Sequence, residues 1–553
     1  MVAIVAAGAL AVTLAGCGGD SNDDDSTDNG SSDTGGTLVF GSSADPVILD
    51  GAFVSDGESL RPIRQIFETL VTTKEGGTDI VPLLAKTWTP SDDGLEWTFD
   101  LQTGVKFQDG TDFNAAAVCT NFDRWYNFTG ILQSASVSYY YQTVFGGYAS
   151  NDDPALPTSL YKSCEATDDS TAVITLSHAS STFISGLSLP SFSIASPDAL
   201  EKYDADSVSG TGDAPNFDGT FGTEHPIGTG PFKFESWDRG TKLTLTRNDD
   251  YWGTKAILKT LVFQPIADGP ARLAALQAGD IDGYDLVDPA SAATLASDDQ
   301  FQILQRPAFN VGYLGFNSSI APLDNPDIRK AIAYAINKAK IISTIYPPGA
   351  EAAIEFQPPQ LFGWTDTVEQ YSYDPEKAKQ MIADSGVANP TVEFWYPTDV
   401  ERPYMPDPKG VFELMKADLE AVGFTVTPKS APWNPDYLAE NQAGTQQLYL
   451  LGWTGDFGDP DNFLGTFFQA QSPQWGFNDP EIFDALNAAE AEPDADTRTE
   501  DYKKANELIM DFVPGVPYVH TQPSIAFKAG VTGFVPSPTN NEDFAKVSVP
   551  TAS

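Results

Sequence analysis

Positive charge is scarce in this sequence, which holds 31 lysines and arginines against 77 aspartates and glutamates, a formal net charge of −46. Nucleic-acid binding depends on neutralising phosphates with cations, so this balance excludes it. We interpret the acidity as a source of solubility. Because 41% of the residues are hydrophobic and 12% are aromatic, the carboxylates must coat a folded body and not a disordered chain.

Residues typical of catalysis and metal binding are also few. The three histidines, His178, His225 and His520, lie far apart, with no His-x-x-x-His or Cys-x-x-Cys spacing. Neither a Gly-x-Ser-x-Gly elbow nor a phosphate-binding Gly-x-x-x-x-Gly-Lys-Ser/Thr loop occurs, and we interpret 228–231 as a turn that leads into a strand. Among 77 acids, chance carboxylate pairs carry no evidence for a glycosidase. The sequence predicts no enzyme, no metal and no cofactor.

Apolar runs long enough to cross a membrane are missing as well, because such a span needs roughly 20 apolar residues. The main one, Met1–Gly16, ends in Leu-Ala-Gly directly before Cys17. This pattern is typical of a secretory signal and resembles a bacterial lipobox, so we predict a signal peptide over 1–16 and a lipid on Cys17. No Lys or Arg precedes the run, so we expect translation to start further upstream. The alternative is an accidental cysteine in a disordered terminus.

Residues 17–36 are almost wholly Gly, Ser, Asp, Asn and Thr after the cysteine, which predicts a disordered acidic tether. Cys119 and Cys164 are the two remaining cysteines. An oxidising compartment favours a disulfide between them. Two buried free thiols remain the alternative, because sequence separation does not reveal bond geometry.

Strands and helices alternate along the body. Period-two or apolar runs predict strands at Glu96–Leu101, Thr171–Leu176, Lys242–Thr246, Leu258–Phe263, Val311–Phe316, Thr391–Tyr396 and Gln447–Leu451. Asn-Pro and Asp-Pro pairs predict helix starts at Asn325-Pro326 (a region that closes at 347–349), Asp374-Pro375 (ending near Gly386) and Asp479-Pro480. The pattern indicates an α/β protein.

The chain beyond the tether resembles the extracytoplasmic peptide-binding proteins of peptide ABC transporters, bacterial solute-binding protein family 5. The segments that carry the resemblance, in order, are Phe67–Val71, Val81–Ala85 with Trp88, Asp93–Phe99, Gly104–Gly110, Pro226–Phe232, Leu276–Asp282, Val311–Asn317 and Tyr373–Ala378. It implies an α/β, two-lobed periplasmic-binding-protein-like fold (type II, cluster C) with an accessory domain and a hinge that closes over ligand. The implied segments are lobe I at 37–84, 185–305 and 514–553, the accessory domain at 85–184, and lobe II at 306–513.

Two further segments resemble the dipeptide-binding branch of this family. Arg402 follows the strand end at 395–397 and corresponds to the arginine for a peptide carboxylate, while Asp456, within 452–463, corresponds to the aspartate for its ammonium. Without the family, these residues would be an exposed cation and a turn residue. Tyr404 and Trp453 are adjacent to these charges, so we expect them to wall the ligand cavity, with Thr454 and Gly455 among the ligand-binding residues. The loop Ser55-Asp56-Gly57 occupies the place of a family loop that contacts the peptide backbone.

A zwitterionic peptide suits such a pair, because each enclosed charge must meet a counter-charge and the guanidinium fork binds a carboxylate through two hydrogen bonds. The resemblance therefore implies a monomeric binding protein for di- or tripeptides, anchored outside the cytoplasmic membrane, with ABC permease subunits as partners. Haem, a nickel chelate, an oligosaccharide or a longer peptide are alternative cargoes. A sensory surface lipoprotein and a secreted hydrolase are alternative functions.

Overall fold

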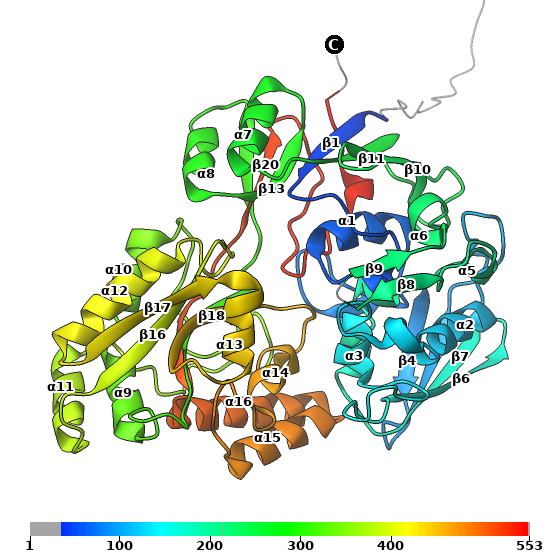
Figure 1. Ribbon diagram of the computed structural model, residues 1–553. Coiled ribbons are helices and arrows are strands. Elements are labelled where there is room, and N and C mark those ends of the chain that lie inside the picture. The colour runs from blue at the N-terminus through cyan, green and yellow to red at the C-terminus, as the bar shows by residue number, and fades with distance from the viewer. Residues whose placement is uncertain (1–34, 213, 551–553) are drawn as a thin grey trace, which may run out of the picture. The chain divides into compact units, whose positions relative to one another are not determined.

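The computed structural model describes residues 35–212 and 214–550 (Figure 1). The predicted signal peptide, Cys17 and nearly all of the predicted tether lie outside these residues. Gly35–Ser553 forms one compact unit. Within the described ranges, no helix combines the length and the apolarity that a membrane crossing requires.

A seven-stranded sheet organises the first lobe, in the order β10-β11-β12-β1-β13-β20-β14. β1 pairs in parallel with β12 and β13, and the other neighbours are antiparallel. The bounds are β1 (Thr37–Ser42), β10 (Phe232–Asp238), β11 (Lys242–Arg247), β12 (Thr260–Pro265), β13 (Gly283–Val287), β14 (Phe301–Gln305) and β20 (Ser524–Lys528). Its helices are α1 (Gly57–Ile66), α4 (Phe183–Gly186), α5 (Pro197–Lys202), α6 (Phe221–Glu224), α7 (Gly269–Ala278) and α8 (Pro289–Ala296), with the hairpins β2–β3 (Val71–Thr73, Ile80–Pro82) and β8–β9 (Val208–Thr211, Ala214–Phe217).

A four-stranded antiparallel sheet forms the accessory domain, in the order β4-β5-β7-β6. Its elements are β4 (Ala85–Pro90), β5 (Glu96–Leu101), α2 (Ala115–Tyr126), α3 (Tyr139–Phe145), β6 (Tyr161–Asp168) and β7 (Thr171–Leu176). A disulfide joins Cys119 of α2 to Cys164 of β6, with a Cα–Cα distance of 5.1 Å. The buried residues of this sheet belong to the same hydrophobic cluster as those of the first lobe, so the two share one core.

A five-stranded sheet forms the second lobe, in the order β17-β16-β18-β15-β19. β16 runs parallel to β17 and β18, whereas β15 is antiparallel to β18 and β19. The strands are β15 (Asn310–Phe316), β16 (Thr391–Thr398), β17 (Thr425–Pro432), β18 (Leu448–Thr454) and β19 (Gly515–Val519). The helices are α9 (Pro326–Ala335), α10 (Lys338–Ile345), α11 (Pro375–Asp384), α12 (Pro408–Ala421), α13 (Leu438–Gln442), α14 (Gly465–Phe468), α15 (Pro480–Ala491) and α16 (Ala495–Phe512).

The expected strands all occur, with ends displaced by up to three residues, and α9, α11 and α15 begin at the expected prolines. Each of these helices has an Asn or Asp N-cap whose side chain accepts a backbone N–H. The helical region after Asn325 differs from the expectation, because it breaks at Ile336 and restarts where Asn337 caps α10.

One predicted border, given to within about ten residues, lies a few residues too early. The sequence-based segmentation placed Pro514–Ser553 in the first lobe, yet β19 pairs with β15 in the sheet of the second lobe. All five residues of β19 are buried there, because a strand that covers the sheet edge removes its apolar side chains from water. The chain returns to the first lobe only after Val519.

Two chain segments connect the lobes, and they lie side by side. The first follows β14 through Arg306, and the second follows β19 through Thr521 and Pro523. The backbone N–H of Arg306 donates to the carbonyl of Pro523 at 2.9 Å, and the backbone N–H of Thr521 donates to the side-chain oxygen of Asn310 at 2.9 Å. The hinge is therefore a paired double strand of chain.

Four buried charges fix the first-lobe end of this hinge; we name Arg61, Asp285, Arg306 and Glu542 the hinge network. Asp285 accepts from Arg61 and from Arg306, both at 2.6 Å. Glu542 accepts from Nε of Arg306 at 2.7 Å and lies 3.8 Å from Arg61. The two arginines hold the pKa of Asp285 well below its usual range against the opposing effect of burial. Every charge in the network has a partner.

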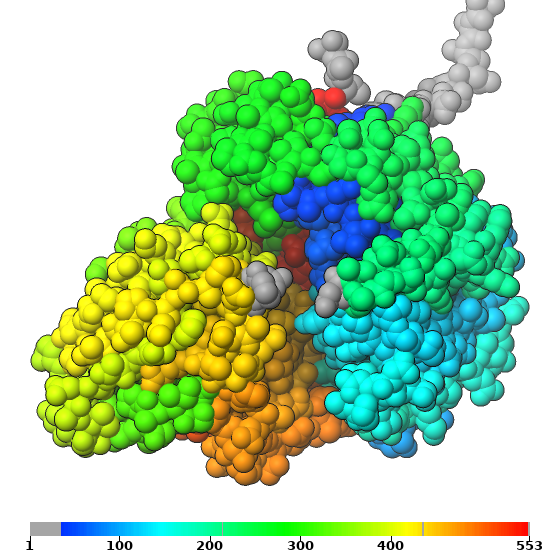
Figure 2. All heavy atoms as spheres, in the orientation of Figure 1, coloured from blue at the N-terminus to red at the C-terminus, as the bar shows by residue number. Residues whose placement is uncertain are grey.

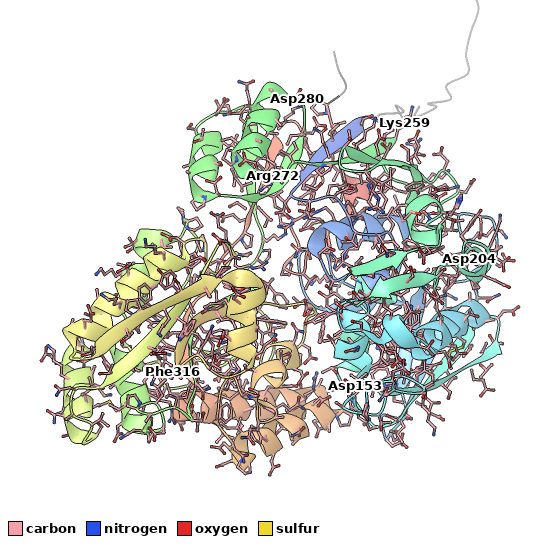
Figure 3. The ribbon with its side chains drawn as sticks, in the orientation of Figure 1. Asp153, Asp204, Lys259, Arg272, Asp280 and Phe316 are labelled. Atoms are coloured by element: carbon pink, nitrogen blue, oxygen red, sulfur yellow. A yellow bond between two sulfur atoms is a disulfide. The ribbon has the colours of Figure 1, made fainter. Side chains whose placement is uncertain are left out.

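Acidic side chains coat the surface, as the composition predicts. Asp153, Asp204 and Asp280, labelled in Figure 3, are exposed in three separate turns between elements. Phe316 of β15, labelled in the same view, is fully buried.

Candidate functional site

Both candidate ligand segments leave the second-lobe sheet at one edge. β16 and β18 run parallel, so their carboxyl ends meet there, and ligands of α/β sheets bind outside such ends. The amino end of β15 lies at the same edge, because Asn310 pairs with Thr454. The chain therefore passes to the first lobe at the edge that carries the candidate residues. The face shown in Figure 2 is hollowed between the yellow second lobe and the blue amino-terminal segment, with the dark red carboxy-terminal segment at its floor.

Asp456 follows β18 in a segment that Asn462 holds in place. The backbone N–H of Asp456 and the indole Nε1 of Trp453 both donate to Oδ1 of Asn462, at 2.8 and 3.1 Å. Gly455 lies against Phe309, where a Cβ atom would come within 2.2 Å of the ring carbon Cε1. Only glycine fits this approach, which fixes the direction in which Asp456 leaves the strand.

Among the residues that the structure describes, only neutral groups donate hydrogen bonds to the Asp456 carboxylate. The Tyr140 hydroxyl donates to Oδ1 at 2.9 Å, and Nδ2 of Asn462 lies 3.4 Å from Oδ2. In the described part of the chain no lysine or arginine forms an ion pair with Asp456. Burial raises the pKa of Asp456 to about 6, and the hydrogen bonds from Tyr140 and Asn462 oppose part of that rise. An added cation would stabilise the ionised carboxylate.

Asp459, three residues further on, has the opposite environment. Both of its oxygens accept from the guanidinium of Arg498, at 2.8 and 2.9 Å, and the pair is buried. Its Oδ1 also accepts the backbone N–H of Asp461 at 3.0 Å. Asp459 is therefore committed to the fold, whereas Asp456 is available to a ligand.

Arg402 lies in a tight loop beyond β16. Its backbone pairs with Met405 through two hydrogen bonds, of 3.2 and 2.8 Å, and its guanidinium carbon lies 4.9 Å from the centroid of the Trp433 ring. The side chain is exposed. No carboxylate of the described residues pairs with it, so its charge is free to meet an anion.

Tyr404 brings the arginine loop against the aspartate segment. It is 6% exposed, and a Cβ atom on Gly452 of β18 would lie 2.3 Å from Cδ2 of its ring. Its backbone carbonyl accepts the hydroxyl of Tyr346 at 2.8 Å, and the Thr521 hydroxyl of the second crossing donates to the carbonyl of Pro403 at 3.0 Å. Tyr404 packs beneath the site, and Trp453 and Thr454 are partly exposed beside it.

The loop Ser55-Asp56-Gly57 stands apart from these residues. It is exposed on the first lobe, where Asp56 caps α1 by accepting the backbone N–H of Ser59 at 2.8 Å. Among the described residues, no hydrogen bond or ion pair joins this loop to Asp456 or Arg402. Its assignment as a peptide-binding loop stays a prediction.

Two residues at the site escaped sequence reasoning. Asn462 lies within 452–463, where the sequence pattern indicates no role for it, although its side chain organises Asp456 and Trp453. Tyr140 lies more than 300 residues away in sequence, on the accessory domain. The run Tyr139-Tyr140-Tyr141 was the only available signal, and nothing in it indicates which ring meets an aspartate.

Metal and histidine chemistry finds little support at this site. In residues 35–212 and 214–550, no group of three or more His, Cys, Asp or Glu side chains is placed to hold a metal ion. His520 is buried at the second crossing, with Nδ1 2.6 Å from the carbonyl oxygen of Asn310, and burial lowers its pKa to about 4. His225 stacks on Tyr203 at 3.8 Å, and His178 is exposed.

Two lobes joined by a paired hinge are the architecture of a solute-binding protein, and one sheet edge beside the hinge carries two opposite charges without ion-pair partners among the described residues. The sequence profile described as "Bacterial extracellular solute-binding proteins, family 5 Middle" matches residues 79–475. The chain belongs to this family, whose members are binding components of transport and not enzymes.

Curated relatives differ in the ligand that their names give. The chain is 32% identical to a dipeptide-binding protein of Escherichia coli, over 88% of this chain and 89% of that protein. It is 33% identical to heme-binding protein A of Haemophilus influenzae, over 98% of each. The family is therefore established, while the cargo differs within it.

Solved structures agree with the fold. HbpA2 of Haemophilus parasuis superposes with a TM-score of 0.81 at 29% identity, covering 93% of this chain and 100% of that one. The periplasmic binding protein DppA of Helicobacter pylori, in complex with the peptide STSA, superposes with a TM-score of 0.72 at 29% identity, covering 93% and 98%. The fold is thus the α/β fold of periplasmic binding proteins.

Proposed function

We propose that this protein captures short peptides, chiefly di- and tripeptides, and delivers them to the permease of a peptide ABC transporter. Asp456 receives the α-ammonium of the peptide and Arg402 its carboxylate. The observation that carries the proposal is that, among the described residues, neither Asp456 nor Arg402 has a partner of opposite charge at this sheet edge. A partly buried carboxylate with its pKa raised to about 6 gains a counter-charge when an ammonium arrives. The relatives named for dipeptide binding support this cargo.

Closure of the hinge would enclose the peptide between the lobes, a motion common in this class of binding protein. Water-filled space between the two charged ends would accommodate different side chains, because bridging waters adapt to them. The closed form would present its permease-binding surface only when loaded. Small-angle scattering should therefore show a smaller radius of gyration with saturating Met-Leu, together with a higher melting temperature.

Calorimetric titration of capped and free dipeptides tests the charge assignment. Wild type should bind Met-Leu two to three decades more tightly than N-acetyl-Met-Leu or Met-Leu-amide, because each cap leaves one enclosed charge unpaired at a cost of roughly 3 to 5 kcal/mol. Asp456→Asn should remove the preference against the acetyl cap, and Arg402→Ala the preference against the amide. Equal affinity for capped and free peptides would reject the assignment.

The anchoring proposal concerns Cys17. We infer that the mature chain is a monomer held at the outer face of the cell membrane by a lipid on this residue, reached through the acidic tether. Cys17→Ala should release the protein from the membrane fraction or leave its precursor uncleaved. An unchanged partition between membrane and medium would contradict the anchor.

Haem is the second candidate cargo, favoured by the similarity to heme-binding protein A of Haemophilus influenzae. Haem carries two propionates and no ammonium, so it would leave Asp456 without a counter-charge. Absorbance titration with haemin separates the two cargoes. If haem is the cargo, Asp456→Asn should bind haemin at least as well as wild type, whereas peptide binding requires the carboxylate.

A further inference from the structure

A cavity of about 320 Å³ lies where the accessory domain meets the second lobe. The accessory domain lines it with α3, the segment before β6 and the loop after β7, and the second lobe with the segment after β18, α14 and the end of α15. Beside it, the backbone N–H of Ser181 donates to the carbonyl of Glu490 at 3.3 Å, and the Ser181 hydroxyl donates to the same carbonyl. Asp456 and Arg402 are not among the described residues that line it, so the cavity needs an explanation of its own.

Asp461 presents a carboxylate to this cavity. Its Oδ1 is buried and has no hydrogen-bond partner within the described part of the chain. A Cβ atom on Gly465 would clash with this oxygen, so only glycine leaves the room that the carboxylate occupies. Burial and the charges of Glu490 and Asp459 raise the pKa of Asp461 well above its usual value. Arg498 opposes this rise, but its guanidinium is bound to both oxygens of Asp459.

Glu490, at the end of α15, is the second carboxylate of the cavity. Its Oε2 accepts from Nε2 of Gln469 at 2.6 Å, which is a neutral donor. Among the described residues, neither Asp461 nor Glu490 forms an ion pair, and no lysine or arginine lines the cavity. Two carboxylates that raise each other's pKa and lack a cation favour a positively charged occupant.

The remaining walls indicate which kind of cation fits. Over the residues that the structure describes, no three His, Cys, Asp or Glu side chains are grouped to hold a metal ion, and the hard divalent cations require more oxygen ligands than two carboxylates supply. Val144, Leu160 and Phe457 give the cavity apolar walls. Its volume lies at the small end of the range for pockets that bind organic molecules, roughly 300 to 1,000 Å³. An alkyl chain would pack against the apolar walls while its ammonium groups reach the carboxylates.

We propose that this cavity is a second ligand site, which binds a short aliphatic amine through Asp461 and Glu490 and thereby joins the accessory domain to the second lobe. The site goes beyond the proposed function, because it requires neither a peptide nor the charges at the sheet edge. An ammonium between the two carboxylates supplies the counter-charge that both lack. The bound amine stabilises the packing of the two parts that line the cavity.

Calorimetric titration with 1,4-diaminobutane tests the proposal on the full protein without peptide. Wild type should bind the diamine in a saturable way, and its melting temperature should rise with the diamine concentration by mass action. 1,4-Butanediol has the same chain and no charge, so it should not bind. Salt at about 0.15 M screens the general attraction of amines to a chain of net charge −46.

Asp461→Asn and Glu490→Gln each remove one carboxylate from the cavity. Each should weaken diamine binding roughly 10- to 100-fold, the range for a hydrogen bond to a charged group. Asp484→Asn is the matched control, because Asp484 is exposed on α15 and is not among the described residues that line the cavity. It makes the same change of net charge and should bind the diamine as wild type does. Thermal unfolding without ligand checks that the two cavity variants remain folded, and if one unfolds, the other decides.

Three results would overturn the proposal. The site is rejected if wild type shows no saturable binding. An equal loss in Asp484→Asn would show that the diamine binds the acidic surface in general. If Asp456→Asn loses the diamine while both cavity variants keep it, the amine occupies the candidate ammonium site instead. Because none of these titrations uses a peptide, their outcome is independent of the proposed function.

Discussion

The hinge network and the candidate ligand edge both place opposite charges at the junction of the lobes, yet they treat those charges differently. In the hinge network two arginines and two carboxylates meet at 2.6 to 3.8 Å. At the candidate ligand edge, the described part of the chain offers Asp456 neutral donors only, and Arg402 contacts an aromatic ring. In the hinge network, every charge therefore has a partner of opposite sign without any ligand.

This difference indicates which charges stabilise the fold and which are candidates for ligand binding. Removing the partner of a buried charge destabilises the fold by several kcal/mol, because the remaining charge is left uncompensated. Charges that stay unpaired beside a cleft are therefore candidates for ligand binding. By this criterion Asp456 and Asp459, three residues apart, have different roles, and only the contacts distinguish them.

Arg306→Ala should produce the largest loss of stability. It leaves Asp285 and Glu542 buried with one fewer counter-charge each, so we expect the free energy of unfolding to fall by roughly 3 to 5 kcal/mol. Urea unfolding measures this loss. Lys379→Ala is the control, because its ion pair with Glu376 is exposed and should contribute about 0 to 1 kcal/mol. Similar losses in both variants would contradict the comparison.

Asp459→Asn and Asp456→Asn are a matched pair of variants, and we expect them to change the free energy of unfolding in opposite directions. Asp459→Asn leaves the buried Arg498 without its carboxylate and should lower the free energy of unfolding by roughly 3 kcal/mol. Asp456→Asn should raise it at pH 7 by about 1 kcal/mol, after allowance for partial exposure, because a carboxylate with a raised pKa destabilises the fold when ionised. Destabilisation by both variants would show that Asp456 is structural.

Binding of Met-Leu should depend on pH through Asp456. The pKa of its carboxyl in the ligand-free protein is about 6, so protonation competes with the ammonium below that pH. The affinity should fall by up to about tenfold per pH unit below pH 6, and again above about pH 8 as the peptide amine loses its proton. Titrations from pH 4.5 to 9 measure this. In Asp456→Asn the loss of affinity at low pH should disappear. A loss of affinity that persists at low pH would have to arise from another titratable group.

Arg402→Ala should have the smallest effect on stability. The side chain is exposed and unpaired within the described residues, so the free energy of unfolding should change by less than about 0.5 kcal/mol. The same variant should lose its affinity for free dipeptides. A large loss of stability would move Arg402 from the ligand site to the fold.

Much of the fold was predictable, because apolar periodicity and Asp-Pro or Asn-Pro caps are local signals. β5 and β7 occur with the predicted bounds, and α11 begins at the predicted proline. The border near Pro514 failed because the strand Gly515–Val519 is equally apolar in either lobe, and only its pairing with β15 decides. No local pattern contained that information.

The site was predictable only where the family pattern marks it. Asp456 and Arg402 came from such segments, and the structure places them at one sheet edge. Tyr140 could not be found, since its contact with Asp456 depends on how the accessory domain packs against the second lobe. The contrast between Asp456 and Asp459 likewise required Arg498, which lies 39 residues beyond Asp459.

Native mass spectrometry of the protein as purified from cells tests the central claim most directly. If the unpaired charges at the ligand edge serve peptide termini, wild type should carry a mixture of bound masses that fragment as free di- and tripeptides. Asp456→Asn, purified in parallel, should carry far less of them. Bound haem, a bound sugar, or peptides retained equally by both proteins would contradict the account.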